Sequence, residues 1–274
     1  MQDRIVMKTH ENEVMVKLEE WRKKAPGGVW ATTPVNLEEV GKYWGVKKVI
    51  RRKLDIAGLL YRLEEGGSIV FLKEDDPPSR QRFSLAHELG HIVMSDSGLP
   101  EISCRKDGEI NKDLERCCDV IAAELLMPQQ EFCLMADKLG WCLGGVNELA
   151  RRFKISEESA AIRMRDLKTE PVLMSMWRAG QKPLSGLDLL WARPNEPAKR
   201  FSSSVHWKRG PDELAPIHQA LQTPGVITGS CRVLMDVGGE SKSKSFEWVQ
   251  TEGLRIGGGR IKRVIGFHYL ARKT

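Results

Sequence analysis

Two histidines and a glutamate stand close together in the sequence, at His87, Glu88 and His91. They form the pattern H-E-x-x-H, in which the two imidazoles lie one turn apart on the same face of a helix. Both rings can then reach one metal ion. Glu88 follows the first histidine and can orient and deprotonate a water on that metal. The pattern predicts a metal-dependent peptide hydrolase with Glu88 as its catalytic base.

The residues around this pattern favour a helix. Ser84 can cap it, and Gly90 would let another segment approach its metal-facing side. Apolar residues recur at helical spacing: Phe83, Leu85, Ala86, Leu89 and Ile92. The pattern alone also fits an amphipathic helix whose histidines face solvent. Unpaired histidines would be costly in so apolar a helix, which favours metal binding.

A zinc peptidase site needs three protein ligands and one open position, so a third ligand is expected downstream. Nine acidic or cysteine residues could supply it: Glu101, Cys104, Glu109, Asp113, Glu115, Cys117, Cys118, Asp119 and Glu124. Residues 113–127 are expected to form a helix that Pro128 ends. At about 100° per residue, Glu115, Cys118 and Asp119 share one face of this helix. Glu124 falls on the opposite face, where we expect it to be solvated.

We therefore predict that Glu115 is the third metal ligand. Asp119 is predicted to hydrogen-bond the outer ring nitrogen of a metal-bound histidine. Cys118 would lie on the metal-facing side, where a redox or thiolate role competes with ordinary packing, the usual role of a buried free cysteine.

Two segments resemble the ImmA/IrrE family of metallopeptidases: RQRFSLAHELGH at 80–91 and ERCCDVIAAELLMP at 115–128. The family shows R-x-F-t-x-A-H-E-x-x-H, followed by E-x-x-x-N-x-x-A-A-x-L-L-M-P. Its third metal ligand is the glutamate four residues before the asparagine, a position that Glu115 occupies here. Asp119 stands where the family usually has asparagine. An aspartate at this position gives the pattern E-x-x-x-D, which is found in gluzincin peptidases. The resemblance covers roughly the first half of the chain.

The resemblance implies an endopeptidase of limited specificity that cuts a regulatory protein, typically a helix-turn-helix transcriptional repressor. Cleavage would derepress stress-response or mobile-element genes. Zn²⁺ suits a site of two histidines and a glutamate, and Mn²⁺ is compatible with the same nitrogen and oxygen donors.

The composition is that of a globular protein of one or two domains, with 274 residues, 41% apolar and 29% charged. The start of the chain has no apolar segment typical of a secretory signal, and no run is long enough to span a membrane. The six cysteines are irregularly spaced, which predicts reduced thiols and a cytoplasmic protein. The formal charge of +6 is uneven: residues 1–139 carry 21 Lys+Arg and 24 Asp+Glu, and residues 140–274 carry 22 and 13.

We predict an α+β fold in three parts. Residues 1–139 are expected to form a zincin-like metallopeptidase domain with a small antiparallel sheet, in which the run 68–72 is the edge that would hold substrate as an added strand. Residues 140–170 are expected to form a helix-turn-helix-like segment. Residues 171–274 are expected to form an α+β sensor-like domain, GAF-like in some relatives, with a helix at 212–222 and a turn at 253–259.

The helix-turn-helix-like segment raises the question of DNA contact. In DNA-reading proteins of this kind the second helix presents its first residues to the bases. Here these are Glu157, Glu158 and Ser159, and two acids facing phosphates argue against direct reading. Four basic residues remain as possible contacts to DNA or a partner: Arg151, Arg152, Lys154 and Arg163.

Two other functions compete with the peptidase. One is a DNA-binding regulator whose metal site is structural or sensory, and the basic second half favours it. The other is a protein–protein adaptor with a degenerate site. A structural metal site needs no general base, so the presence of Glu88 favours the peptidase.

Overall fold

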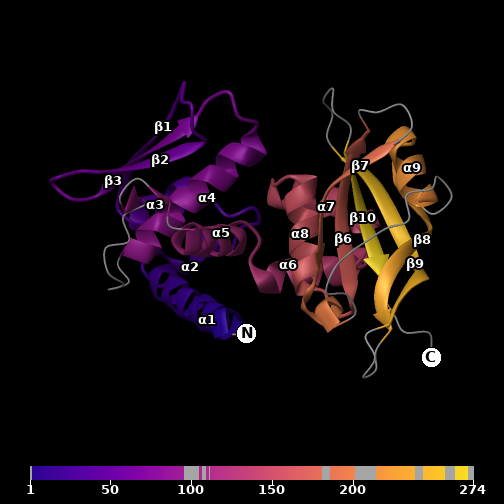
Figure 1. Ribbon diagram of the computed structural model, residues 1–274. Helices are drawn as coiled ribbons and strands as arrows, with labels where there is room; N and C mark the ends of the chain where they lie inside the picture. Colours follow the sequence, from indigo (N-terminus) through magenta and orange to yellow (C-terminus); the bar gives the residue numbers. More distant parts are fainter. Residues whose placement is uncertain are drawn as a thin grey trace. The chain divides into compact units, whose positions relative to one another are not determined.

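A computed structural model describes residues 2–95, 105–106, 109–110, 112–180, 186–200, 214–237, 243–256 and 263–270. Helices and strands are mixed along the chain, so the predicted α+β class is confirmed (Figure 1). The chain divides into two compact units, residues 1–131 with 151–156 and residues 132–150 with 157–274. The division at 139/140 and 170/171 stays a prediction. Every helix among the described residues is too short or too polar to cross a bilayer.

The first unit opens with three helices, α1 (Gln2–Arg22), α2 (Gly27–Trp30) and α3 (Leu37–Tyr43). Asn36 caps α3 by accepting a hydrogen bond from the backbone N–H of Glu39, and Gly45 ends this region with a φ of +86°. A sheet of β1 (Val46–Arg52), β2 (Gly58–Arg62) and β3 (Ser68–Lys73) follows. Two further helices follow, α4 (Pro78–Ser95) and α5 (Lys112–Leu126), with β4 (Arg105–Lys106) and β5 (Glu109–Ile110) between them.

Two predictions about this sheet are wrong. The strand order is β1-β3-β2, with β1 parallel and β2 antiparallel to β3, so the sheet is mixed rather than antiparallel. The run 68–72 lies in β3, which is paired on both sides and cannot accept an added strand. The burial pattern gives the reason: Val70 and Leu72 are buried, whereas Leu59 and Tyr61 of β2 are exposed. The edge strand is therefore β2.

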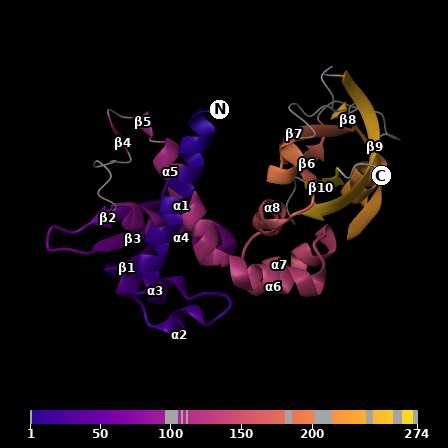
Figure 2. The ribbon, with the colours of Figure 1, turned by 90° about the horizontal axis from the view of Figure 1, so that it is seen from below.

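The helices α4 and α5 pack side by side (Figures 1 and 2). Their approach is closest where Gly90 meets Cys118. A Cβ atom on Gly90 would stand 3.0 Å from Cys118 Cα and 3.1 Å from its carbonyl oxygen. Glycine is therefore needed at position 90 for the two backbones to come this near.

Glu124, on α5, is buried. The prediction from helical spacing that this side chain is solvated is therefore wrong. Its Oε1 accepts hydrogen bonds from Arg22 Nη2 at 3.4 Å and from the backbone N–H of Gln129 at 3.1 Å. The face of α5 opposite the metal-facing residues is covered by α1, which supplies the arginine. A carboxylate buried in this way is tolerated because it is paired.

The second unit contains all of α8 (Glu157–Leu167), most of α6 (Gln129–Leu139) and part of α7 (Val146–Phe153). It continues with five strands, β6 (Val172–Ala179), β7 (Leu187–Pro194), β8 (Val226–Val237), β9 (Ser243–Ile256) and β10 (Arg263–Tyr269). They form an antiparallel sheet in the order β7-β6-β10-β9-β8. The helix α9 (Ala215–Gln222) packs on β6, β8, β9 and β10 and covers a core that includes Trp177, Ile217 and Val264.

The turn predicted at 253–259 is wrong at its start, because β9 continues to Ile256. Gly253 lies under α9, where an added Cβ would stand 2.8 Å from the carbonyl oxygen of Pro216. The glycine is required for close packing of helix on strand rather than for a turn. Residues 257–262 lie outside the described residues.

A hydrogen-bonded histidine lies inside this sheet. His268 is completely buried, with Nε2 2.7 Å from Ser175 Oγ and Nδ1 2.9 Å from Thr251 Oγ1. The indole N–H of Trp177 donates to the same Ser175 oxygen at 2.7 Å. Burial lowers the pKa of His268 to about 3, so the ring is neutral in the folded protein near pH 7.

We expect Gly90→Ala to lower the free energy of unfolding of the first unit by about 1–3 kcal/mol, because α4 and α5 must separate to admit the methyl group. Urea denaturation followed by circular dichroism measures the effect. Gly28→Ala is the matched control: nothing lies within 4 Å of its added Cβ, and its stability should be unchanged or slightly higher. Equal effects of the two substitutions would contradict the close packing described here.

We expect the second unit to lose stability in acid because of His268. Its pKa is lower in the folded state than in the unfolded chain, where it is about 6.5, so the unfolded state binds more protons below that pH. Between pH 6.5 and 5 the loss from this one group is roughly 1.5 kcal/mol. His268→Gln should flatten the pH dependence of thermal unfolding, whereas the same change at the partly exposed His218 should alter it much less. Parallel pH profiles for wild type and His268→Gln would contradict this origin.

Candidate metal centre

Three side chains from two helices converge between α4 and α5. His87 and His91 project from one face of α4, and Glu115 projects from α5. One potential ligand atom of each lies within 4.8 Å of the others. Glu115 Oε2 is 3.1 Å from His87 Nε2, and Glu115 Oε1 is 3.7 Å from His91 Nε2. The described residues therefore provide two imidazole nitrogens and a carboxylate facing a common point, which is the donor set that zinc peptidases use.

The contacts of His87 fit a cation at this point. His87 Nδ1 lies 3.0 Å from Asp119 Oδ1, so a neutral ring with its proton on Nδ1 donates it to that carboxylate. His87 Nε2 then faces Glu115 with a lone pair only 3.1 Å from an anionic oxygen. Two such acceptors remain close only if a proton or a metal ion lies between them. The donor set thus fits a divalent metal.

The electrostatics of the two histidines differ. Burial favours the neutral ring of His87, but the hydrogen bond to Asp119 and the charges of Glu88 and Glu115 outweigh it and raise the pKa. Burial and the charge of His87 lower the pKa of His91, and the positive charge of Arg62 adds to this effect. Arg62, at the end of β2, is therefore near enough to the centre to act on it electrically.

Glu88 lies at the edge of β2. It is buried, with 7% of its surface exposed, and the backbone N–H of Leu60 donates a hydrogen bond to its carboxylate. A Cβ on Gly58 would stand 2.7 Å from Glu88 Oε1, so a glycine at this position makes room for the carboxylate. Burial and the charge of Glu115 raise the pKa of Glu88 to about 7. A carboxyl group with this pKa can both accept and return a proton near neutral pH.

Sequence reasoning missed Gly58 and Leu60. The only sequence signal is a glycine that opens a β-prone run, and nothing in that run points to Glu88. The helical spacing predicted Cys118 on the metal-facing side of its helix but gave it no partner. In the structure its Sγ lies 3.4 Å from His91 Nδ1.

Other residues considered for the site are placed elsewhere or not described. Glu124 pairs with Arg22 on the far face of α5. Glu101 and Cys104 lie outside the described residues, and the side chain of Glu109 is not described. The basic residues Arg151, Arg152 and Lys154 are exposed around the end of α7, and Arg163 is half-buried on α8. None of them belongs to the metal-ligand cluster.

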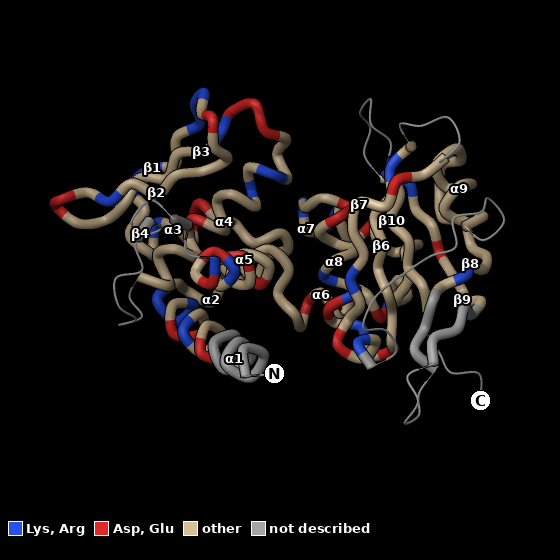
Figure 3. Tube along the Cα trace, viewed as in Figure 1, with Lys and Arg blue, Asp and Glu red and all other residues tan. Residues whose placement is uncertain are grey.

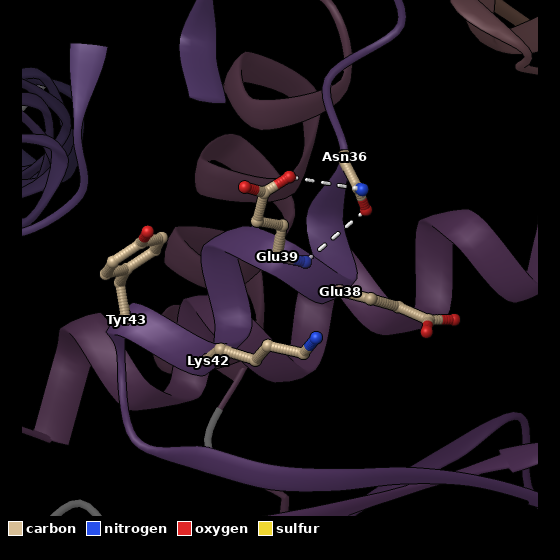
Figure 4. A pocket seen from close by; sticks show the side chains of 5 residues that line it. All are labelled: Asn36, Glu38, Glu39, Lys42 and Tyr43. Atoms are coloured by element: carbon tan, nitrogen blue, oxygen red, sulfur yellow. Dashed lines mark hydrogen bonds between the residues drawn. The ribbon is translucent and has the colours of Figure 1, made fainter. Parts of the chain in front are cut away.

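A separate cavity of about 540 Å³ lies on α3 (Figure 4). It is lined by Asn36, Glu38, Glu39, Lys42 and Tyr43. Asn36 and Glu39 hydrogen-bond each other there as the cap of α3. The lining contains none of the residues of the metal centre, so this cavity is not part of it.

Comparison with known proteins gives a family for the first part of the chain. Residues 42–165 match the family described as IrrE N-terminal-like domain. The chain is similar to the radiation response metalloprotease IrrE of Deinococcus radiodurans, with 31% identity over 119 residues, which are 42% of this chain and 36% of that protein. It is also similar to the protein of the same name from Deinococcus deserti, with 30% identity over 111 residues. These cover 39% of this chain and 40% of that protein, so the match spans well under half of either relative.

A solved structure shows the same type of fold. It is a transcriptional regulator from Mycobacterium tuberculosis, with a TM-score of 0.54 and 13% sequence identity over 94% of this chain and 76% of that one. At this identity the likeness concerns the fold alone. Over residues 42–165, the sequence comparisons therefore confirm the resemblance to the ImmA/IrrE family of metallopeptidases seen in the two helix motifs.

Proposed function

We propose that this chain is a metal-dependent endopeptidase. The observation that carries the proposal is the convergence of His87, His91 and Glu115 beside a buried Glu88. The three converging side chains would hold the metal, for which we propose Zn²⁺, with Mn²⁺ as the alternative. When bound, the metal supplies a Lewis acid that activates water and polarises the scissile carbonyl.

The residues of the chain supply the remaining steps. Glu88 takes the proton of the attacking water and then passes it to the leaving amine. Asp119 accepts the outer N–H of His87 and so keeps Nε2 free to act as a ligand. Arg62 carries a positive charge near the centre, where negative charge develops on the carbonyl oxygen during attack.

The substrate backbone would bind along β2. The carbonyl oxygen of Ala57 accepts a hydrogen bond from the N–H of Lys73 in the pairing with β3, so alternate backbone groups of β2 face the other way. The backbone N–H and C=O groups of Gly58, Leu60 and Arg62 face away from β3, on the side of β2 where no described strand pairs with it. The N–H of Leu60 donates a hydrogen bond to Glu88, so this edge lies beside the residue that we propose as the base. An extended peptide added here would pass the metal centre.

For the substrate itself we propose a regulatory protein, in particular a helix-turn-helix transcriptional repressor whose cleavage derepresses stress-response or mobile-element genes. This proposal is supported by the match of residues 42–165 to the IrrE N-terminal-like domain family. We further propose that the chain acts in the cytoplasm, where such a repressor is found.

A DNA-binding regulator is the alternative function, and the exposed Arg151, Arg152 and Lys154 favour it. Charges of both signs line α7 and α8 (Figure 3). Glu158, in the first turn of α8, pairs with Arg263 of β10 at 2.8 Å. Ala160, Ala161 and Met164 are buried. The start of α8 is thus engaged with the sheet of its own unit, which argues against insertion of this helix into a groove.

The test of the peptidase is cleavage of a helix-turn-helix repressor encoded in the same operon, by purified protein with Zn²⁺ or Mn²⁺ added. Glu88→Gln should reduce the cleavage rate by about 10²–10⁴-fold, because it removes the proton acceptor. The variant should retain its metal by elemental analysis. Glu64→Gln, on an exposed acid of the β2–β3 turn, is the control and should cleave normally. Unchanged cleavage in Glu88→Gln would sink the proposal and favour a structural metal.

Metal binding tests the ligand set independently of any substrate. Glu115→Gln should lower Zn²⁺ affinity by more than about 100-fold, because losing a ligand costs more than losing an outer hydrogen-bond partner. Competition with a chromophoric chelator measures the affinity. Asp113→Asn, on the same helix but outside the cluster, should bind like wild type. Equal affinities for Glu115→Gln and wild type would show that the third ligand is another residue.

A further inference from the structure

Cys118 makes a contact that gives it a role at the metal centre. It lies on α5 between Glu115, three residues before it, and Asp119, which follows it. Its side chain is fully buried, and its Sγ lies 3.4 Å from His91 Nδ1. One helix therefore contacts both histidines on their outer nitrogens, with Asp119 at His87 and Cys118 at His91.

The direction of the hydrogen bond follows from the placement of His91. Its Nε2 faces Glu115, on the side where the ligand atoms converge. A nitrogen that binds a metal carries no proton, so in the ligating tautomer the ring proton is on Nδ1. The Nδ1–H then points at the sulfur of Cys118, which accepts it.

We propose that Cys118 is a positioning residue, whose sulfur holds the His91 ring with Nε2 directed at the metal. The proposal rests on the metal centre proposed above. Outer hydrogen-bond partners of metal-bound histidines fix both ring orientation and tautomer, and removing one typically lowers metal affinity by about 10–100-fold.

The surroundings explain why sulfur occupies this position. The side chain of Asp119 is 58% exposed, so water solvates the carboxylate that serves His87. Cys118 is sealed by the close approach of Gly90, where a carboxylate would lose its hydration. A thiol is small and weakly polar, so it can accept a hydrogen bond in a dry site at little cost. The two histidines consequently have different outer partners, an exposed carboxylate at His87 and a buried sulfur at His91.

Zn²⁺ affinity of Cys118→Ala, Cys118→Ser and wild type, measured by chelator competition, tests the proposal. We expect an affinity about 10-fold or more weaker for Cys118→Ala, and a smaller loss for Cys118→Ser, whose hydroxyl can still accept the Nδ1–H. Cys117→Ala, on the neighbouring half-buried cysteine, is the matched control and should bind like wild type. Thermal unfolding without metal shows whether a variant has lost affinity through loss of folding.

Affinity within twofold of wild type for Cys118→Ala would overturn the proposal. Equal losses in the alanine and serine variants would also overturn it, because the change of volume common to both would then explain the effect. If wild type itself binds no Zn²⁺, the proposed metal centre fails and not this inference alone.

A measurement on the wild-type protein keeps the proposal testable if the variants do not fold. In the Zn²⁺-loaded protein, ¹⁵N NMR of the histidine side chains should show His91 protonated on Nδ1, with a proton that exchanges slowly with water. A His91 ring protonated on Nε2 would exclude the proposed hydrogen bond.

Discussion

The close approach of α4 and α5 is the constraint on which the centre depends. Neither helix alone supplies the three proposed metal ligands, because the histidines lie on α4 and Glu115 lies on α5. Gly90 sets the separation, since its missing side chain allows the backbone of Cys118 to come within 3.0–3.1 Å of where a Cβ would be. Once the helices meet there, the period of α5 brings Glu115 and Asp119 to His87, and Cys118 to His91.

The sheet contributes a buried position for the carboxylate of Glu88. Glu88 follows His87 on the same helix but faces β2, where Gly58 leaves space and Leu60 donates a backbone hydrogen bond. Burial makes Glu88 easier to protonate, whereas Asp119 stays in contact with water. Of these two acids near the same histidine, only Glu88 is enclosed by the protein.

Local sequence patterns predicted the helix that carries Glu115 well, including its end before Pro128. They also indicated which residues of α4 and α5 share a face. The order of β1, β2 and β3 in the sheet could not be predicted from local patterns, because strand pairing depends on contacts between residues distant in sequence. The same applies to Glu124, whose partner Arg22 is 102 residues away. Gly253 shows a third limit: a glycine suited to a turn is as well suited to lie under a helix.

The buried His268 has a consequence for how the second sheet assembles. Its two ring nitrogens bind Ser175 of β6 and Thr251 of β9, so one side chain on β10 ties together three strands. If either neighbouring strand slid along β10, buried polar atoms would be left without partners, at about 1–3 kcal/mol for each. The hydrogen bonds therefore act as an alignment key: they distinguish the native pairing from shifted pairings that would bury similar amounts of apolar surface.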